Sequence, residues 1–206
     1  ENDGFPGLVI DRYAEALVLK LYTPAWIPHL KEFCDALAQV SPASHLILRL
    51  NRSLQKQTEF LYGFSDGMTL SHQTPPSLIL FRENGFIFES DPIHGQKTGF
   101  FLDQRDNRAR VENLSKDKSV LNVFAYTGGF SVYAARGGAR QVVSVDSSTP
   151  ALEAALRNMK YNQHISSVTA ASHETIAEDA FEVLARMASE KRLIDLVIID
   201  PPMFAQ

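Results

Sequence analysis

Three apolar runs in the second half of the sequence constrain the fold more than any other feature. Each run is typical of a short strand and ends in a glycine turn or an acid, with helix-like segments in between. Strands that alternate with helices predict parallel βαβ units, whose binding residues gather at the carboxyl ends of the strands. The runs and their endings are 120–124 with Tyr126-Thr-Gly-Gly129, 141–145 with Asp146, and 193–199 with Asp200.

Residues 1–92 show a different pattern, of short strands, turns and one helix. Two apolar runs, 8–13 and 16–22, flank a brief turn, and Asn84-Gly85 predicts a second hairpin. Apolar residues recur at helical spacing from Trp26 to Val40. We therefore predict a smaller α+β domain at 1–92 and a Rossmann-like α/β domain at 93–206. Two segments carry weaker signals, and for these we predict loop with short strands at 51–76 and a third α/β strand within 168–176.

The composition excludes several classes of protein. The chain of 206 residues is 45% hydrophobic and 21% charged, which is typical of a globular protein and not of a disordered one. No run of about 18 apolar residues occurs, so we predict no membrane partner. The single cysteine, Cys34, excludes a disulfide framework and a cysteine zinc site, and favours a cytoplasmic location. The net charge of −4 argues against a uniformly basic nucleic-acid binder, but a local basic surface stays open, with candidates Arg49, Arg52, Lys56, Arg105, Arg108 and Arg110.

The glycine turn after 120–124 and the acid Asp146 predict a nucleoside-binding site. Glycines let a backbone approach a ligand closely, and a carboxylate at the end of the second strand accepts hydrogen bonds from a ribose diol. The alternatives are a plain connection and a helix N-cap. The sequence lacks the dinucleotide-binding motif Gly-x-Gly-x-x-Gly and the phosphate-binding motif Gly-x-x-x-x-Gly-Lys. These absences argue against a nicotinamide-dependent oxidoreductase and an NTPase, respectively. The histidines lack metal-ligand spacing, so we predict no metal site.

Two further segments are candidates for the site. Asp200-Pro201-Pro202 places a rigid acid at the end of an apolar strand, near Phe204, where it suits a hydrogen-bonding nucleobase. The segment 94–105 combines two glycines, two aromatic residues and several polar groups directly before the α/β units. The alternatives are a turn with a buried phenylalanine for the first segment and a domain junction for the second.

Together these segments resemble the class I S-adenosylmethionine-dependent methyltransferases, and most closely the bacterial 23S rRNA (cytosine-C5) methyltransferases with PUA, EEHD and Rossmann-like domains. The opening Asp3–Tyr13 resembles the start of the EEHD domain. The resemblance implies a sheet of strand order 3-2-1-4 that is cut short, and a chain without the N-terminal PUA domain and the later strands. The matching blocks are Lys97–Arg108, Leu121–Phe130, Val143–Asp146 and Asp200-Pro-Pro.

The resemblance also implies the role of each site residue, with S-adenosylmethionine as the cofactor. Asp146 would bind the ribose and Asp179 the adenine amine. Phe100 or Phe101 would pack on the cofactor, and Arg105 would bind its carboxylate. The methionine part would lie among Phe124, Ala125, Tyr126, Thr127 and Gly128, and the sulfonium and target base would border the catalytic residues Asp200, Pro201 and Pro202.

The implied function is methyl transfer to 23S rRNA or a ribosomal precursor, at cytosine C5. That reaction needs a thiolate that attacks C6. The resemblance places this cysteine beyond Gln206, and Cys34 has the apolar neighbours of a structural cysteine. We therefore expect residues 1–206 alone to be inactive. Two alternatives stay open, namely methylation of an exocyclic amine such as guanine N2 and a non-catalytic RNA-binding or assembly module with a vestigial cofactor pocket. A homodimer stays open as an assembly state.

Overall fold

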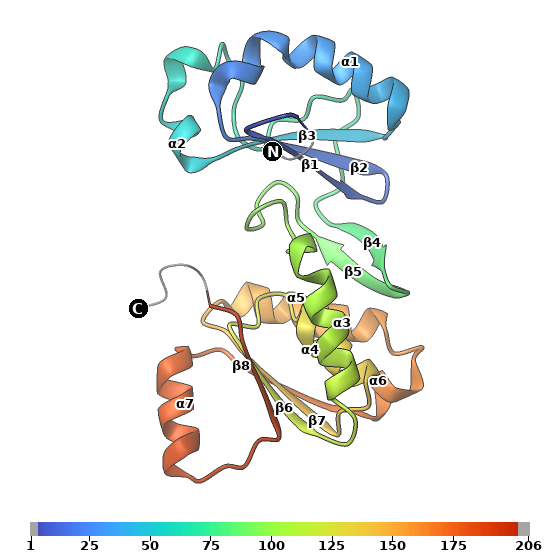
Figure 1. The fold of residues 1–206 in the computed structure, drawn as a ribbon, viewed down its shortest axis with the longest axis vertical. Coiled ribbons are helices and arrows are strands. Elements are labelled where there is room, and N and C mark those ends of the chain that lie inside the picture. The colour runs from blue at the N-terminus through green and yellow to red at the C-terminus, as the bar shows by residue number, and fades with distance from the viewer. Residues whose placement is uncertain (1–3, 202–206) are drawn as a thin grey trace. The chain divides into compact units, whose positions relative to one another are not determined.

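The computed structural model describes residues 4–201 and divides the chain into two compact units (Figure 1). The first unit comprises Glu1–Arg82 and Glu89–Leu102, and the second comprises Glu83–Phe88 and Asp103–Gln206. The second unit is therefore built from two separate stretches of sequence.

The first unit contains a three-stranded sheet, in which β1 (Leu8–Tyr13) pairs antiparallel with β2 (Ala16–Leu21) and β2 pairs parallel with β3 (His45–Leu50). The predicted β1–β2 hairpin is confirmed, with Tyr13 opposite Ala16 on either side of the turn. One face of the sheet is covered by η1 (Pro24–His29) and α1 (Leu30–Val40). The apolar core between them contains Leu19, Leu21, Ile27, Leu30, Leu48 and Leu50.

The second predicted hairpin is formed by β4 (Ile79–Glu83) and β5 (Phe86–Ser90). Its turn residues Asn84 and Gly85 both have positive φ, at 49° and 87°. This backbone is the one that an Asn-Gly turn adopts when its twist matches that of the flanking strands. The sequence signal for the hairpin is thus confirmed.

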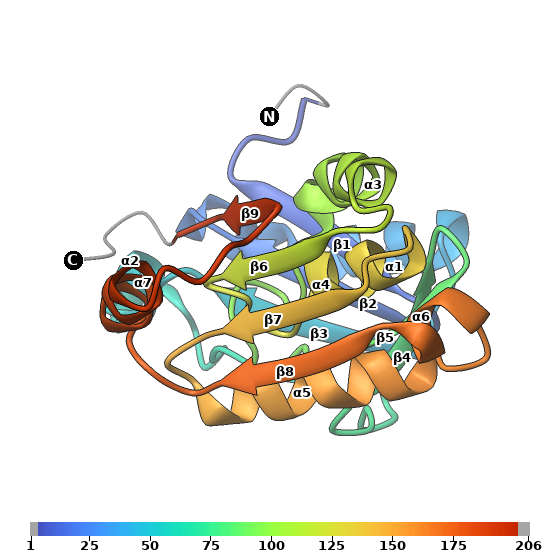
Figure 2. The same ribbon diagram turned by 90° about the horizontal axis from the view of Figure 1, so that it is seen from below.

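The second unit contains a parallel four-stranded sheet of order β8-β7-β6-β9, with β6 in a central position (Figure 2). Its helices α4 and α5 contact one face, and α7 packs against the other through an apolar cluster. The α/β class with a parallel sheet is therefore confirmed. The elements are η3 (Leu102–Gln104), α3 (Arg105–Leu114), β6 (Ser119–Val123), α4 (Gly129–Arg136), β7 (Gln141–Val145), α5 (Thr149–Tyr161), α6 (Ser166–Ala170), β8 (Ser172–Ile176), α7 (Ala180–Ser189) and β9 (Leu196–Ile199).

One secondary-structure prediction is wrong. The segment predicted as loop with short strands contains α2 (Arg52–Gln55) and η2 (Thr58–Phe60), because Asn51 accepts the backbone N–H of Leu54 as an N-cap and the helix buries that leucine. The strand predicted within 168–176 is confirmed as β8, and helix α6, which buries Val168, comes directly before it.

No helix within residues 4–201 is both long enough and apolar enough to cross a membrane.

Candidate functional site

The carboxylate of Asp146 joins two strand ends of the second unit. Its Oδ2 accepts the backbone N–H of Tyr126 at 2.7 Å, and its Oδ1 accepts the N–H of Ser148 at 2.9 Å. Asp146 follows β7 and Tyr126 lies in the loop after β6, so the two predicted elements of the nucleoside site meet at the carboxyl edge of the sheet. In Figure 2 the carboxyl ends of β6, β7 and β8 all lie on the side of α7.

The loop after β6 has an unusual backbone. Phe124, Tyr126 and Gly128 all have positive φ, at 60°, 47° and 72°, a region that non-glycine residues rarely adopt. At Gly128 a side chain is excluded for a second reason, because an added Cβ would lie 2.6 Å from the Cβ of Ala155. Residues held in such conformations cluster at ligand sites, where surrounding contacts maintain them.

Helix α5 supplies one of those contacts, and sequence reasoning missed it. The side chain of Asn158 is fully buried and donates from Nδ2 to the backbone oxygen of Thr127 at 2.9 Å. Asn162, one turn later, is also fully buried. Two asparagines four residues apart on the apolar face of a helix are the sequence signal that could have identified this contact.

Asp179 caps helix α7. Its Oδ1 accepts the backbone N–H groups of Phe181 at 2.8 Å and Glu182 at 3.2 Å. The neighbouring Phe181 is 52% exposed, and its ring lies edge-on to that of Phe124, with 6.2 Å between centroids. The structure thus places the start of α7 beside the loop after β6.

Asp200 follows β9 directly and is exposed. The amide of Gln104, in η3, donates to its Oδ1 at 3.4 Å. This contact within the second unit joins Gln104 to the acid that follows β9, although Gln104 itself was not among the predicted site residues. Pro201 is exposed, and the predicted catalytic Pro202 lies outside the described residues.

The segment 97–105, which contains the predicted cofactor contacts Phe100, Phe101 and Arg105, is divided between the two units after Leu102. Its Phe100 is buried in the first unit, with its ring 5.1 Å from that of Phe81. The ring of Phe101 lies under the ammonium of Lys97 at 4.3 Å. Arg105 begins α3 in the second unit, where its side chain is 3.6 Å from Asp106.

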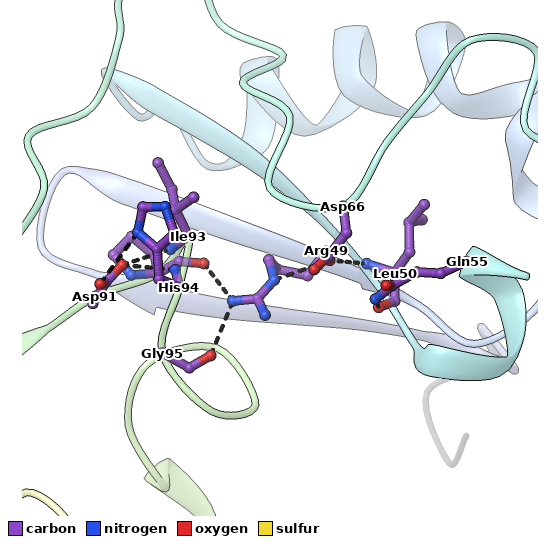
Figure 3. Close-up of polar contacts among 9 residues, drawn as sticks. Arg49, Leu50, Gln55, Asp66, Asp91, Ile93, His94 and Gly95 are labelled. Carbon is purple, nitrogen blue, oxygen red and sulfur yellow. Dashed lines mark hydrogen bonds and ion pairs between the residues drawn. The ribbon is translucent and has the colours of Figure 1, made fainter. Parts of the chain in front are cut away.

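Arg49 anchors the approach to this segment within the first unit (Figure 3). Its Nη1 donates to the backbone oxygens of Pro92 and Gly95, at 2.8 and 3.2 Å, and its Nε contacts Asp66 at 3.0 Å. Asp91 holds the same loop from the other side by accepting the N–H groups of Ile93 and His94. The imidazole Nδ1 of His94 lies 3.4 Å from the carboxylate of Asp91.

One residue predicted for the basic surface, Arg108, does not lie at the surface. Arg108 is 2% exposed and forms a two-pronged ion pair with Glu83, at 2.9 and 2.7 Å. Tyr133 also donates its hydroxyl to Glu83 at 2.9 Å, and the burial of that phenol raises its pKa. A charge that is buried and paired in this way contributes nothing to a surface.

A chain of buried hydroxyl groups crosses the sheet under α4. Ser131 accepts from Asn122 at 2.9 Å and contacts Ser144 at 2.7 Å, and Ser144 contacts Nε2 of His173 at 2.8 Å. Burial lowers the pKa of His173 to about 4, because it disfavours the charged imidazolium. These residues form a polar support behind the candidate site and not part of its surface.

Comparison with known sequences matches residues 8–206 to the S-adenosylmethionine-dependent methyltransferase family. A ribosomal RNA large subunit methyltransferase of Deinococcus radiodurans is 48% identical over 206 residues, which are 100% of this chain and 49% of that protein. The ribosomal RNA large subunit methyltransferase I of Pseudoalteromonas translucida is 38% identical over 205 residues, covering 100% of this chain and 50% of that protein. The chain therefore spans about half the length of these relatives.

Solved structures show the same likeness. A candidate SAM-dependent methyltransferase from Streptococcus mutans superposes with a TM-score of 0.82 at 30% identity, covering 98% of this chain and 50% of that one. A candidate methyltransferase crystallised with SAH gives a TM-score of 0.83 at 30% identity, covering 99% of this chain and 50% of that one.

Proposed function

The chain belongs to the S-adenosylmethionine-dependent methyltransferase family, and from that premise we propose that its second unit binds S-adenosylmethionine for methyl transfer to large-subunit ribosomal RNA. The observation that carries this proposal is the position of Asp146, fixed by two backbone N–H groups at the carboxyl edge of the sheet. The names of the relatives support the RNA substrate.

The residues at this edge fit an adenosine group. Each oxygen of Asp146 accepts one backbone hydrogen bond, and a carboxylate oxygen has a further lone pair for a ribose hydroxyl. The half-exposed ring of Phe181 offers a flat apolar surface, and the carboxylate of Asp179 lies two residues before it. When bound, the cofactor would supply the electrophilic methyl group. The chain's own residues would orient it through the ribose and the loop 124–128.

For the target atom we propose cytosine C5, with Asp200 and the prolines after it beside the base. The contact from Gln104 supports this position, because it limits how the exposed carboxylate can turn. Cys34 does not fit the role of nucleophile, since its burial raises the pKa of the thiol and disfavours the reactive thiolate. The resemblance to the cytosine-C5 enzymes implies a different cysteine as the nucleophile for C5, at a position beyond Gln206. An exocyclic amine, which needs no cysteine, is the alternative target.

The first unit offers one candidate contact for RNA phosphates. Lys20 lies directly opposite Arg49 in the β2–β3 register, and burial, followed by the charges of Arg49 and Lys97, lowers the pKa of Lys20. Arg49 is itself paired with Asp66 at 3.0 Å, so Lys20 is the member of this pair that we propose to contact a phosphate of the rRNA.

Cofactor binding is tested by calorimetry with S-adenosylhomocysteine on the complete protein. We expect binding in the wild type and its loss in Asp146→Ala. Preferential binding of NAD would contradict the proposal.

The target is tested by methylation of 23S rRNA with the complete protein, followed by mass spectrometry of the nucleosides. We expect 5-methylcytidine. A product methylated on guanine N2 would favour the amine alternative. Cofactor binding without methylation of RNA or of ribosomal particles would favour the assembly module.

A further inference from the structure

Two fully buried asparagines, Asn158 in α5 and Asn162 at its C-cap, make different contacts although they are four residues apart. Asn158 donates from Nδ2 to the backbone oxygen of Thr127 at 2.9 Å. Asn162 accepts the N–H of Ile87 at 2.9 Å and donates to the oxygen of the same residue at 2.7 Å. The first asparagine thus contacts the loop after β6, and the second contacts strand β5.

The contact of Asn158 fixes one peptide plane of that loop. The peptide between Thr127 and Gly128 has its oxygen bonded to Asn158, and its N–H donates to the oxygen of Ala125 at 2.9 Å. Of the two residues that flank this peptide, Gly128 has a positive φ of 72°. A peptide next to a glycine can rotate between two orientations, and a donor bonded to its oxygen selects one of them.

The neighbouring N–H groups of the loop are held by backbone or by Asp146. Ala125 donates to the oxygen of Val145 at 2.9 Å, and Tyr126 donates to Asp146 at 2.7 Å. Asn158 is therefore the side chain of α5 that completes the conformation of the loop next to the proposed ribose ligand.

We propose that Asn158 is a positioning residue, which holds the loop 124–128 in the conformation that receives the methionine part of the cofactor. This inference rests on the proposed function. It goes further in assigning an affinity role to a residue that lies fully buried on the helix behind the loop.

Asn162 provides a matched control at the C-cap of the same helix. It is the same residue type with the same burial, but its side chain contacts Ile87 and the backbone oxygen of Asn158, and not the loop. Replacing it removes a buried asparagine network without touching Thr127. A purely structural role for both residues would give the two substitutions similar effects.

The test measures S-adenosylhomocysteine affinity by calorimetry, and melting temperature separately, in the complete protein. We expect Asn158→Asp to weaken binding about tenfold at pH 8, because a carboxylate of the same shape cannot donate to the oxygen of Thr127. Asn162→Ala should lower the melting temperature while the dissociation constant stays within about twofold of the wild type.

A pH series separates positioning from loss of stability. A buried carboxyl group has a raised pKa, so in Asn158→Asp it becomes protonated as the pH falls and can donate again. We expect the ratio of the variant's dissociation constant to that of the wild type to fall several-fold between pH 8 and pH 5.5. An unchanged ratio, or equal effects of the two substitutions on affinity, would overturn the positioning role. Absence of binding in the wild type would overturn the proposed function and this inference with it.

Discussion

The carboxylate of Asp146 accepts the backbone N–H of Tyr126 at 2.7 Å, although the two residues belong to different βα connections. The acid therefore has two tasks, one toward the loop after β6 and one toward the proposed ribose. A substitution that keeps its shape should separate these tasks.

Asp146→Asn retains one oxygen acceptor and replaces the other with a donor. We expect it to weaken S-adenosylhomocysteine binding at least tenfold, because two hydroxyl groups and two N–H groups then compete for a single acceptor. Calorimetry measures the loss. Ser148→Ala removes a nearby N-cap without changing the acid, so its affinity should match that of the wild type. Equal affinity for Asp146→Asn would exclude the ribose role.

Gly128→Ala should destabilise the protein by about 1–3 kcal/mol, since the new methyl group meets Ala155 and the backbone has positive φ. Gly138→Ala serves as the control in the same unit. Its φ is also positive at +88°, but the added Cβ lies 3.7 Å from its nearest neighbour, an ordinary contact. Urea unfolding compares the two. Ala155→Gly combined with Gly128→Ala should recover part of the loss, and no recovery would contradict the steric explanation.

Asp179→Ser tests whether the cap of α7 also binds adenine. Serine is a good N-cap, so the stability should change little, whereas Asp179→Ala should cost about 1 kcal/mol. If the carboxylate also accepts the adenine amine, both variants should bind S-adenosylhomocysteine more weakly. Both should also lose the preference for S-adenosylhomocysteine over its inosine analogue, which lacks that amine. If Asp179→Ser retains this preference, Asp179 caps the helix but does not bind adenine.

The partly buried His173 predicts a pH-dependent stability. Its folded pKa of about 4 lies below the ordinary histidine value of about 6.5, so only the unfolded chain gains a proton between these values. Stability should be complete above pH 6.5 and fall by about 1.4 kcal/mol per pH unit as the pH drops toward 4. Urea unfolding at several pH values, with His173→Gln as the comparison, measures this contribution. Parallel curves for the two proteins would show that another group is responsible.

Replacing only one partner of the ion pair between Glu83 and Arg108 should strongly reduce the stability of the fold. Glu83→Gln leaves a buried guanidinium without its charged partner and should destabilise the protein by about 3–5 kcal/mol. The double variant Glu83→Leu with Arg108→Met should lose less than the sum of the two single variants in thermal unfolding. Strict additivity would mean that the pair is not coupled.

The sequence predicted the parts of this structure that depend on local patterns. The glycine turn, the strand endings at Asp146 and Asp200, and the Asn84-Gly85 hairpin all follow from residue types at fixed spacing. Helix α6 could not be predicted in this way. Residues 166–170 have no distinctive cap, and the helix is stabilised by the burial of Val168.

The candidate site shows the same division. Asp146 and the loop 124–128 could be located from the sequence, but the contacts that hold them could not. Asn158 and Gln104 act through residues 31 and 96 positions away, and such pairings arise only after the chain has folded. The burial of Arg108 could not be predicted from the sequence either. Arginine side chains are mostly exposed to solvent, and the partner Glu83 lies 25 residues earlier in the chain.

The placement of Glu83–Phe88 in the second unit means that no single cut separates the two units. A gene divided between codons 92 and 93 would leave Arg108 on one polypeptide and Glu83 on the other. The two polypeptides would then have to associate before the second unit could fold. The hairpin turn thus makes the second unit dependent on sequence translated before it, and couples the order of synthesis to the order of folding.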